Sequence, residues 1–326
     1  MSHTLVPVAD DIYQVHLPLP FALNRVNVYL IRGADGWTVV DTGLNTPEAR
    51  AAWDAAFTSL GFRPGELRQI VLTHAHPDHF GLAGWLQEQA GEPLPVYLSE
   101  REAAFARSVW LEGQMADGFD AYLTRLGLPP DAAGVAAHSF YGTAEMTLPH
   151  PARLETLQPG GELQIGRRRF TLVHAPGHSD GQLLFYDPDE HLLLCGDHVL
   201  MKITPNIGVW PEGDPDPLGR FLTSLRDLKR LDVRLALPGH KSLITDWVGR
   251  VDELLAHHEM RLAHMLAAVG SGATVYETAR RVFDSSVFSP HEWRFALAET
   301  LAHLDYLERR GKVRRQDEDV LRFRAV

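Results

Sequence analysis

The most informative segment of the chain reads Thr73-His74-Ala75-His76-Pro77-Asp78-His79, and it places three imidazoles and one carboxylate within six residues. An apolar run, residues 69–72, comes before it, and a helical pattern, residues 80–86, follows it. This order predicts a strand, then a loop that carries metal ligands, then a helix. A surface loop with histidines there by chance is the alternative, which we disfavour because such ligand types rarely cluster without a cation.

The spacing within this segment indicates two ligand positions rather than one. His74 and His76 are two residues apart, so their side chains can point the same way from an extended loop. Asp78 and His79 lie where the loop turns into the helix, so they can project to a second point nearby. One short segment can therefore serve two adjacent metal ions, with His74 and His76 on one and Asp78 and His79 on the other.

The composition is that of a soluble globular protein. The chain has 326 residues, of which 45% are hydrophobic and 22% charged, enough for a large domain and a small one or for two of moderate size. The formal net charge of -11 stays acidic after two divalent ions are added, which disfavours tight non-specific binding to nucleic acid or to an anionic membrane. Cys195 is the single cysteine, so no intramolecular disulfide and no thiolate cluster is expected.

No leader or membrane span is expected from the sequence. Residues 1–7 lack a basic segment followed by an apolar core, and no stretch is long and apolar enough to cross a bilayer. We therefore expect a cytoplasmic protein.

The pattern around the ligand segment is that of an α/β protein. Residues 24–31 and 37–41 read as a β-hairpin, a helix opens at Thr46-Pro47, and residues 95–98 form a further strand. Asp41 ends the second hairpin strand. It is either a plain turn former or, as we favour, a carboxylate that orients a metal-bound histidine or the ligand loop.

Residues from about 99 to 150 interrupt this rhythm. They are helical in pattern and rich in aromatic side chains. An insert of this kind, between two ligand segments, can roof a pocket or can extend the core, and the sequence favours neither.

Three further ligand candidates repeat one design, in which an apolar strand ends in glycine or a Pro-Gly turn and a ligand-type residue follows. They are His178, Asp197 and His240. With Asp197 as a bridge, the two sites are complete: one holds His74, His76, His178 and Asp197, and the other holds Asp78, His79, His240 and Asp197. His174 competes with His178, and we favour His178 because His174 lies within the strand.

These motifs together carry a family resemblance. Asp41, residues 74–79, His178, Asp197 and His240 match, in order and setting, the five motifs of the metallo-β-lactamase fold superfamily, over roughly residues 10–245. The resemblance implies an αββα sandwich with metals at one edge, as a catalytic domain of residues 1–245. The His-x-His-x-Asp-His form is similar to the glyoxalase II, lactonase and nuclease branches, which typically hold two metals. Cys195 does not align with the cysteine ligand of some β-lactamases, so antibiotic hydrolysis is not expected.

Residues 246–326 change in character and read as a helical linker and a winged-helix-like domain. A helix over 246–269, two capping boxes, a helix over 290–310 and strands at 312–316 and 320–323 make this layout. It resembles the C-terminal extension of β-lactamase-like protein 2 and its bacterial relatives. A winged helix suggests nucleic acid, but the presumed recognition helix and the wing tip are acidic, so we favour a packing or dimerisation module.

The predicted activity is that of a binuclear metallo-hydrolase. A hydroxide held between two divalent ions attacks an electrophilic carbonyl, and the ions stabilise the oxyanion. Asp78 and Asp197 are the candidate catalytic carboxylates, since either can take up a proton, although both act mainly as ligands. Nitrogen and oxygen ligands fit zinc first, with manganese or iron as alternatives. We expect a small ester, thioester or lactone as substrate, with Lys202 either pairing with a substrate carboxylate or lying solvated on the surface.

Other functions fit parts of the pattern. The C-terminal layout suggests a metal-dependent ribonuclease or phosphodiesterase, and some members of the superfamily are mononuclear iron oxygenases. A binding protein without turnover is disfavoured because the ligand set is complete. The expected partner is a small molecule, with nucleic acid disfavoured, no membrane association, and a homodimer through the C-terminal domain as the plausible assembly.

Overall fold

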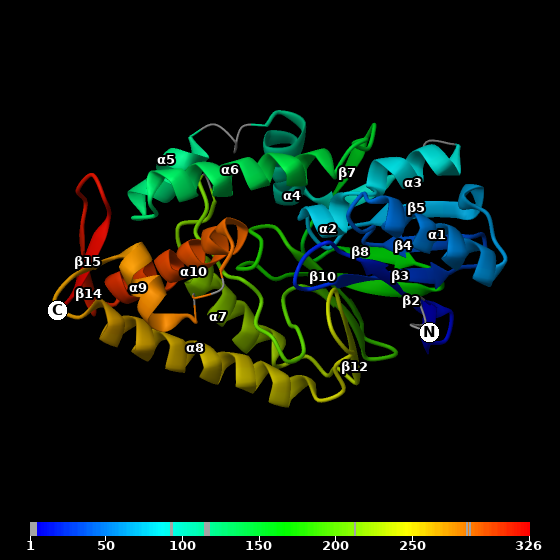
Figure 1. Ribbon diagram of the computed structural model, residues 1–326. Helices are drawn as coiled ribbons and strands as arrows, with labels where there is room; N and C mark the ends of the chain where they lie inside the picture. Colours follow the sequence, from blue (N-terminus) through cyan, green and yellow to red (C-terminus); the bar gives the residue numbers. More distant parts are fainter. Residues whose placement is uncertain (1–4, 92–93, 114–117, 212, 285, 287) are drawn as a thin grey trace.

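The computed structural model describes residues 5–91, 94–113, 118–211, 213–284, 286 and 288–326 (Figure 1). The expectation of a missing leader rests partly on residues 1–4, which lie outside this range. Among the described helices, none combines the length and the apolar character that crossing a bilayer requires.

The first layer of strands is a seven-stranded sheet whose strands follow one another in chain order. Neighbouring strands are antiparallel from β1 to β4 and parallel from β4 to β7. The hairpin and the ligand strand predicted from the sequence are confirmed as β3, β4 and β5. The strands are β1 (Leu5–Ala9), β2 (Ile12–Pro18), β3 (Arg25–Arg32), β4 (Trp37–Val40), β5 (Leu67–Val71), β6 (Val96–Ser99) and β7 (Leu154–Leu157).

The second layer is a five-stranded sheet in the order β12-β11-β10-β9-β8. It packs face to face on the first, and side chains such as Tyr29 and Ile31 from β3 meet Phe170 and Phe185 from the second sheet in one buried cluster. The strands are β8 (Glu162–Ile165), β9 (Arg168–His174), β10 (Leu183–Asp187), β11 (Leu192–Gly196) and β12 (Leu235–Pro238).

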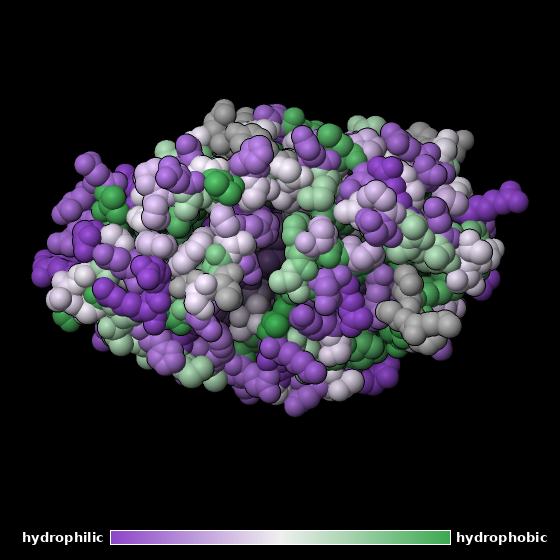
Figure 2. Space-filling model, in the orientation of Figure 1, coloured by the Kyte–Doolittle hydropathy of each residue, from purple (hydrophilic) through white to green (hydrophobic). Residues whose placement is uncertain are grey.

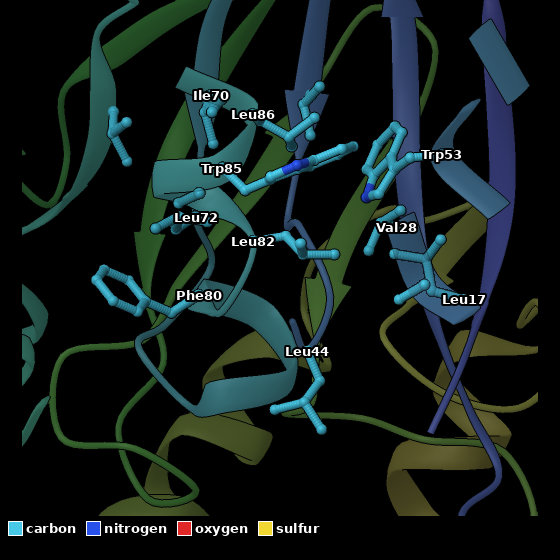
Figure 3. Close-up of a cluster of buried hydrophobic side chains, with 14 of the residues drawn as sticks. Leu17, Val28, Leu44, Trp53, Ile70, Leu72, Phe80, Leu82, Trp85 and Leu86 are labelled. Atoms are coloured by element: carbon cyan, nitrogen blue, oxygen red, sulfur yellow. The ribbon is translucent and has the colours of Figure 1, made fainter. Parts of the chain in front are cut away.

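Helices cover the outer faces of both sheets. α1 (Pro47–Leu60) and α3 (Ala83–Ala90) lie on the first sheet, where Trp53 and Trp85 point toward one another over Val28 (Figure 3). α7 (Pro217–Leu228) and α8 (Trp247–Val269) lie on the second. Residues alternate along each strand between the helix side and the sheet side, as a strand buried on both faces requires. The predicted αββα sandwich is therefore confirmed.

Local sequence signals fix α1 next to the ligand loops. Thr46 caps the helix by accepting from the Ala49 amide at 3.2 Å, and Gly61 ends it in the left-handed conformation. The buried Trp53 indole then donates to the Thr42 carbonyl at 2.9 Å. This bond anchors the loop that follows β4, which begins with Asp41.

The insert does both of the things that the sequence left open. α5 (Phe119–Arg125) and α6 (Pro130–Glu145) share a hydrophobic cluster with the C-terminal helices, so they extend the core. α4 (Glu100–Ala106) and the π-helical segment Arg107–Leu111 instead line a cavity beside the ligand loops.

The C-terminal part has the predicted order of helices and strands. After α8 come β13 (Ala273–Thr274), α9 (Val275–Val282), α10 (Pro290–Arg309), β14 (Val313–Gln316) and β15 (Arg322–Ala325). The strand predicted at 320–323 lies two residues further on. Leu321 is buried, and its amide donates to the Arg125 carbonyl of α5 at 2.8 Å, so it is held by the insert rather than by a strand partner. No sequence pattern predicted β13, which is two residues long and pairs with β15.

Hydrophobic clusters cross the predicted boundary at residue 245. Val251 and Leu254 of α8, with Tyr306 of α10, belong to the cluster that covers the second sheet, and α10 also packs on α5 and α6. The proposed boundary therefore marks a change in topology and not a break in the packing.

This shared packing predicts one cooperative unfolding transition. Leu304 is fully buried between the insert and the C-terminal helices. We expect Leu304→Ala to lower the free energy of unfolding by about 2–5 kcal/mol, as for other large-to-small core changes. In urea titrations, tryptophan fluorescence and far-ultraviolet circular dichroism should shift together. A variant in which only part of the signal moves would show that the C-terminal part unfolds by itself.

Candidate metal centre

The predicted ligands gather at one edge of the sandwich, where the strands that carry them end. The ligand loop follows β5, the His178 loop joins β9 to β10, Asp197 follows β11 directly, and His240 follows β12. α2 (Pro77–Phe80) begins within the ligand segment, with His76 as its N-cap residue. The ligand atoms form three groups in which all lie within 4.8 Å of one another: His74, His76 and His178; Asp78, His79 and His240; and His74, His79 and Asp197.

The first two groups, here called the first and second triad, are the two predicted four-ligand sets without their shared Asp197. In one, the Nδ1 atom of His76 lies 3.0 Å from the Nε2 atom of His178. In the other, the Nε2 atom of His240 lies 3.2 Å from a carboxylate oxygen of Asp78. The two triads approach each other through His74 and His79, whose rings are 4.2 Å apart between centroids.

Asp197 lies between the triads. One of its oxygens is 3.2 Å from His240 Nε2 and 3.7 Å from His178 Nε2, and the other is 3.4 Å from His79 Nε2. A carboxylate whose oxygens together face ligands of both triads has the geometry of a bridge.

The outward nitrogens of the histidines are fixed by protein acceptors. His79 Nδ1 lies 2.8 Å from Asp41, which also accepts from the Thr73 amide at 2.8 Å. Asp41 therefore contacts both a candidate ligand and the ligand loop, as its predicted role requires. His178 Nδ1 lies 2.9 Å from the Asn206 carbonyl, and His240 Nδ1 lies 2.8 Å from the Arg25 carbonyl. These contacts orient the rings with Nε2 toward the centre.

The inward atoms make no hydrogen bond of good geometry, although His79 and His240 lie within ion-pair distance of carboxylates. His74 Nε2, His79 Nε2, His240 Nε2 and Asp197 Oδ1 are buried without a hydrogen bond to any described residue. Leaving such an atom unsatisfied costs about 1–3 kcal/mol. Four of them aimed at one place fit a cation, and a donor set of imidazoles and carboxylates without thiolate fits a divalent metal ion.

The charge distribution differs between the triads. Burial, together with the neighbouring imidazoles, lowers the pKa of His74 well below its usual value, and burial lowers the pKa of His76 to about 3. Burial also opposes the charged form of His79 and His240, but Asp197 and the other carboxylates outweigh it. They raise the pKa of His79 well above its usual value and that of His240 to about 10. Without a metal, protons therefore occupy the second triad.

His174, the competitor of His178, lies away from the centre. It is the last residue of β9, it is exposed, and its Nε2 atom lies 3.1 Å from the Asp180 carbonyl. Lys202 is also exposed and is not among the residues that line the cavity described below. Its role toward a substrate stays a prediction.

Glu102 is a buried residue that the sequence analysis missed. Its carboxylate accepts from the Ala75 amide at 2.8 Å, in the ligand loop, and from the Gly181 amide at 2.8 Å, in the His178 loop. The Ser179 hydroxyl donates to it as well. Burial raises the pKa of Glu102, against these hydrogen bonds, which favour the carboxylate. One side chain thus joins two segments that each carry metal ligands.

The sequence around Glu102 does contain a recognisable pattern, but that pattern predicts a helix cap and not a contact with the ligand loops. Ser99-Glu100-Arg101-Glu102 is the pattern of a capping box, and Ser99 does accept from the Glu102 amide at 3.1 Å. In a complete box the glutamate would bond back to the cap residue. Here it turns to the ligand loops instead, and sequence spacing alone does not distinguish the two arrangements.

A cavity of about 230 Å³ adjoins His76 and His178. The insert forms one wall, with Phe105 and Val109. Another wall is formed by Gly208, Trp210, Pro211, Gly213 and Asp214. Arg101 also lines it, held by an ion pair of 2.7 Å with Asp180. The cavity therefore offers both apolar surface and polar groups next to the first triad.

Comparison with known proteins agrees with this geometry. Residues 22–240 match the family model described as the metallo-beta-lactamase superfamily, and residues 262–326 match the one described as metallo-beta-lactamase-like, C-terminal domain. The chain is 26% identical to the probable metallo-hydrolase YqjP of Bacillus subtilis over 316 residues, 92% of each chain.

Two further similarities cover different shares of the chain. The acyl-coenzyme A thioesterase MBLAC2 of Homo sapiens is 29% identical over 206 residues, which span 59% of this chain and 64% of the human protein. A crystal structure of a metallo-beta-lactamase family protein from Thermus thermophilus superimposes with a TM-score of 0.88 at 34% identity, covering 98% of this chain and 100% of that one.

The position of Glu102 predicts a measurable effect on the metal centre. In Glu102→Gln, the amide nitrogen must face a backbone donor, so one of the two loops loses its bond. We expect metal affinity to fall by about 10- to 100-fold, as for other groups that orient ligands, in competition titrations with a chromogenic chelator. Glu100→Gln, an exposed change on the same helix, is the matched control. Equal affinities in the two variants would contradict the role assigned to Glu102.

Proposed function

Since the chain belongs to the metallo-β-lactamase superfamily and is a metallo-hydrolase of that superfamily, we propose that it uses two divalent ions, zinc in the first place, to hydrolyse a small ester, thioester or lactone. The observation that carries this proposal is the pair of triads with Asp197 between them. Manganese and iron suit the same nitrogen and oxygen ligands.

Among the three substrate classes we favour a thioester. The name of the human relative describes it as an acyl-coenzyme A thioesterase. Phe105, Val109 and Trp210 give the cavity an apolar wall on which an acyl chain can lie, and the cavity opens beside His76 and His178. In a bound thioester, the acyl chain can lie on the apolar wall while the reacting carbonyl lies beside His76 and His178.

The mechanism assigns roles to the residues of the chain. The two triads would hold the ions, which would supply a hydroxide nucleophile at neutral pH and favour negative charge on the carbonyl oxygen. Asp197 lies between the triads and keeps their positions fixed relative to each other. Asp78, beside His240, is the carboxylate of the second triad. Either carboxylate could accept the proton that water gives up on becoming hydroxide and pass it to the thiolate released when the carbon–sulfur bond breaks. Asp41 keeps the His79 ring in place. The apolar wall excludes water from the acyl chain and leaves the carbonyl at the ligands.

The choice of His178 over His174 predicts a sharp difference between two alanine variants. His178→Ala removes a ligand of the first triad, so we expect about one metal ion fewer per chain and a fall in turnover of at least about 100-fold. His174→Ala, an exposed change at the end of β9, should keep both. Metal analysis of protein purified without added metal, beside thioester, lactone and phosphodiester panels, provides the measurement.

The outcomes of that panel separate the rival functions. Phosphodiester turnover alone would replace the proposed activity with that of a nuclease. A single iron with oxygen uptake would indicate an oxygenase. Equal losses in His174→Ala and His178→Ala would contradict the assigned ligand set.

The charge difference between the triads predicts that metal loading depends on pH. The first triad is unprotonated at neutral pH, because burial lowers the pKa of its histidines. In the second, the pKa values of His79 and His240 are raised, to about 10 for His240, so an ion must displace protons. Its affinity should rise by about tenfold per pH unit for each proton displaced, up to that pKa.

Equilibrium dialysis against a fixed, low concentration of free zinc tests this prediction. We expect close to one ion per chain at pH 6 and two at pH 8, with His240→Ala holding one at both. Loading of two ions with no dependence on pH would contradict the assignment.

For the C-terminal part we propose a packing role and, in solution, a homodimer, rather than nucleic-acid binding. The shared hydrophobic clusters support packing, because α10 contacts both the insert and the second sheet. Several arginines of the C-terminal part are paired with acidic side chains and are therefore less available to phosphates. Arg315 pairs with Asp305, and Arg322 pairs with Glu277. The layout of helices and wing strands is consistent with a winged helix used in this way.

A further inference from the structure

Arg294, in α10, is a buried cation without a counter-ion. Arg294 is only 6% exposed, and its Nε atom has no hydrogen-bond partner. Among the described residues, none forms a hydrogen bond or an ion pair with its guanidinium. Burying a charge in this way is costly unless something compensates for it.

Aromatic rings flank the guanidinium but leave its charge unpaired. The Arg294 Cζ atom lies 4.6 Å from the Phe295 ring centre and 5.7 Å from that of Phe140. Such contacts are worth about 0.5–2 kcal/mol and do not satisfy N–H groups. Burial lowers the pKa of Arg294 to about 10, so the side chain keeps its charge at neutral pH.

Hydrogen bonds place this turn of α10 next to the first triad. Asn206 donates its side-chain amide to the Phe295 carbonyl at 3.2 Å, while its own carbonyl lies 2.9 Å from His178 Nδ1. The Phe295 ring contacts Trp210, which lines the cavity beside His178. One residue, Asn206, thus separates the backbone that carries Arg294 from a candidate metal ligand.

The first turn of α10 contacts the loop between β2 and β3. His291, one turn before Phe295, stacks on Phe21 of that loop with ring centres 5.3 Å apart. The face shown in Figure 2 is hollowed near its middle, where the end of α10 approaches this loop and α6 in Figure 1.

Other charges near the centre are already engaged. Arg101, which lines the cavity, pairs with Asp180, and Glu299 of α10 accepts from Asn206 at 3.2 Å. Lys202 is exposed, so water can solvate its charge. Arg294 is therefore a buried cation of this region whose charge no described residue neutralises.

We propose that Arg294 binds an anionic group of the substrate, a carboxylate or a phosphate, while the thioester carbonyl lies at the two triads. This inference rests on the proposed function and deepens it, because it makes the C-terminal part a contributor to substrate selection. The anion can lie on the acyl half, as in a dicarboxylic acid, or on the thiol half, as in the phosphates of coenzyme A.

Matched substrates distinguish these sources. Butyryl-pantetheine carries no charge, succinyl-pantetheine carries a carboxylate on the acyl half, and butyryl-coenzyme A carries phosphates on the thiol half. For the metal-loaded enzyme we expect a higher kcat/KM for one of the charged substrates. In Arg294→Met that preference over the neutral substrate should fall by about 10- to 100-fold, the worth of a charged hydrogen-bonded contact. The substrate whose preference falls identifies the half that carries the anion.

Arg314→Met is the control, since it removes an exposed arginine from β14 of the same C-terminal part. It should keep the wild-type preference. An unchanged preference in a folded Arg294→Met protein would overturn the proposal.

Stability and anion binding provide readouts that do not depend on turnover. An apolar side chain at an unpaired buried charge should leave the unfolding temperature of Arg294→Met equal to or above that of the wild type, whereas a structural role would lower it. If no thioester is hydrolysed, the proposed function fails, and the thermal shift produced by succinate and by inorganic phosphate decides the inference alone. A shift that is lost in Arg294→Met supports it, and an equal shift in both proteins overturns it.

Discussion

The structure depends on holding buried candidate ligand atoms that make no hydrogen bond. Four such atoms point inward at the candidate centre, from His74, His79, Asp197 and His240. At about 1–3 kcal/mol each, the cost of leaving them unsatisfied is comparable to the whole net stability of a domain. The surrounding fold must therefore prevent the loops from collapsing outward, where these groups could find water.

Backbone segments and buried carboxylates keep the ligand loops from moving outward. The ligands come from four separate chain segments, and bonds to other elements hold the loops around them. Asp41 ties the end of β4 to the ligand loop, Glu102 ties that loop to the His178 loop, and Asn27 of β3 donates to the Pro238 carbonyl at 3.0 Å, beside the His240 turn. The two sheets are thereby joined at the edge where the ligands lie.

The sequence pointed to candidate ligands that the structure brings together, but not to the residues that hold their loops. His178, Asp197 and His240 each follow an apolar strand and a glycine, and these are local signals. Gly239 shows the physical need: a Cβ atom there would lie 2.3 Å from Asp197 and 2.6 Å from His79, so only glycine fits. Glu102 and Asn206 act over long sequence separations, one as a hidden cap glutamate and the other through a backbone carbonyl, so no spacing pattern identifies them. The clusters that cross residue 245 also depend on tertiary contacts that periodicity does not encode.

The net charge of -11 gives a reason why a buried cation matters at this centre. An acidic protein repels an anionic substrate at long range, although salt screens exposed charges beyond about 8–10 Å. Specific attraction must therefore come from a charge at close range, where water is excluded and the effective dielectric constant is low. Arg294 satisfies both conditions, because it is buried and its aromatic neighbours leave its N–H groups without an acceptor. The loops that bind metal can then stay unchanged while α10, which lies outside the strands that carry the ligands, sets the charge that the site prefers.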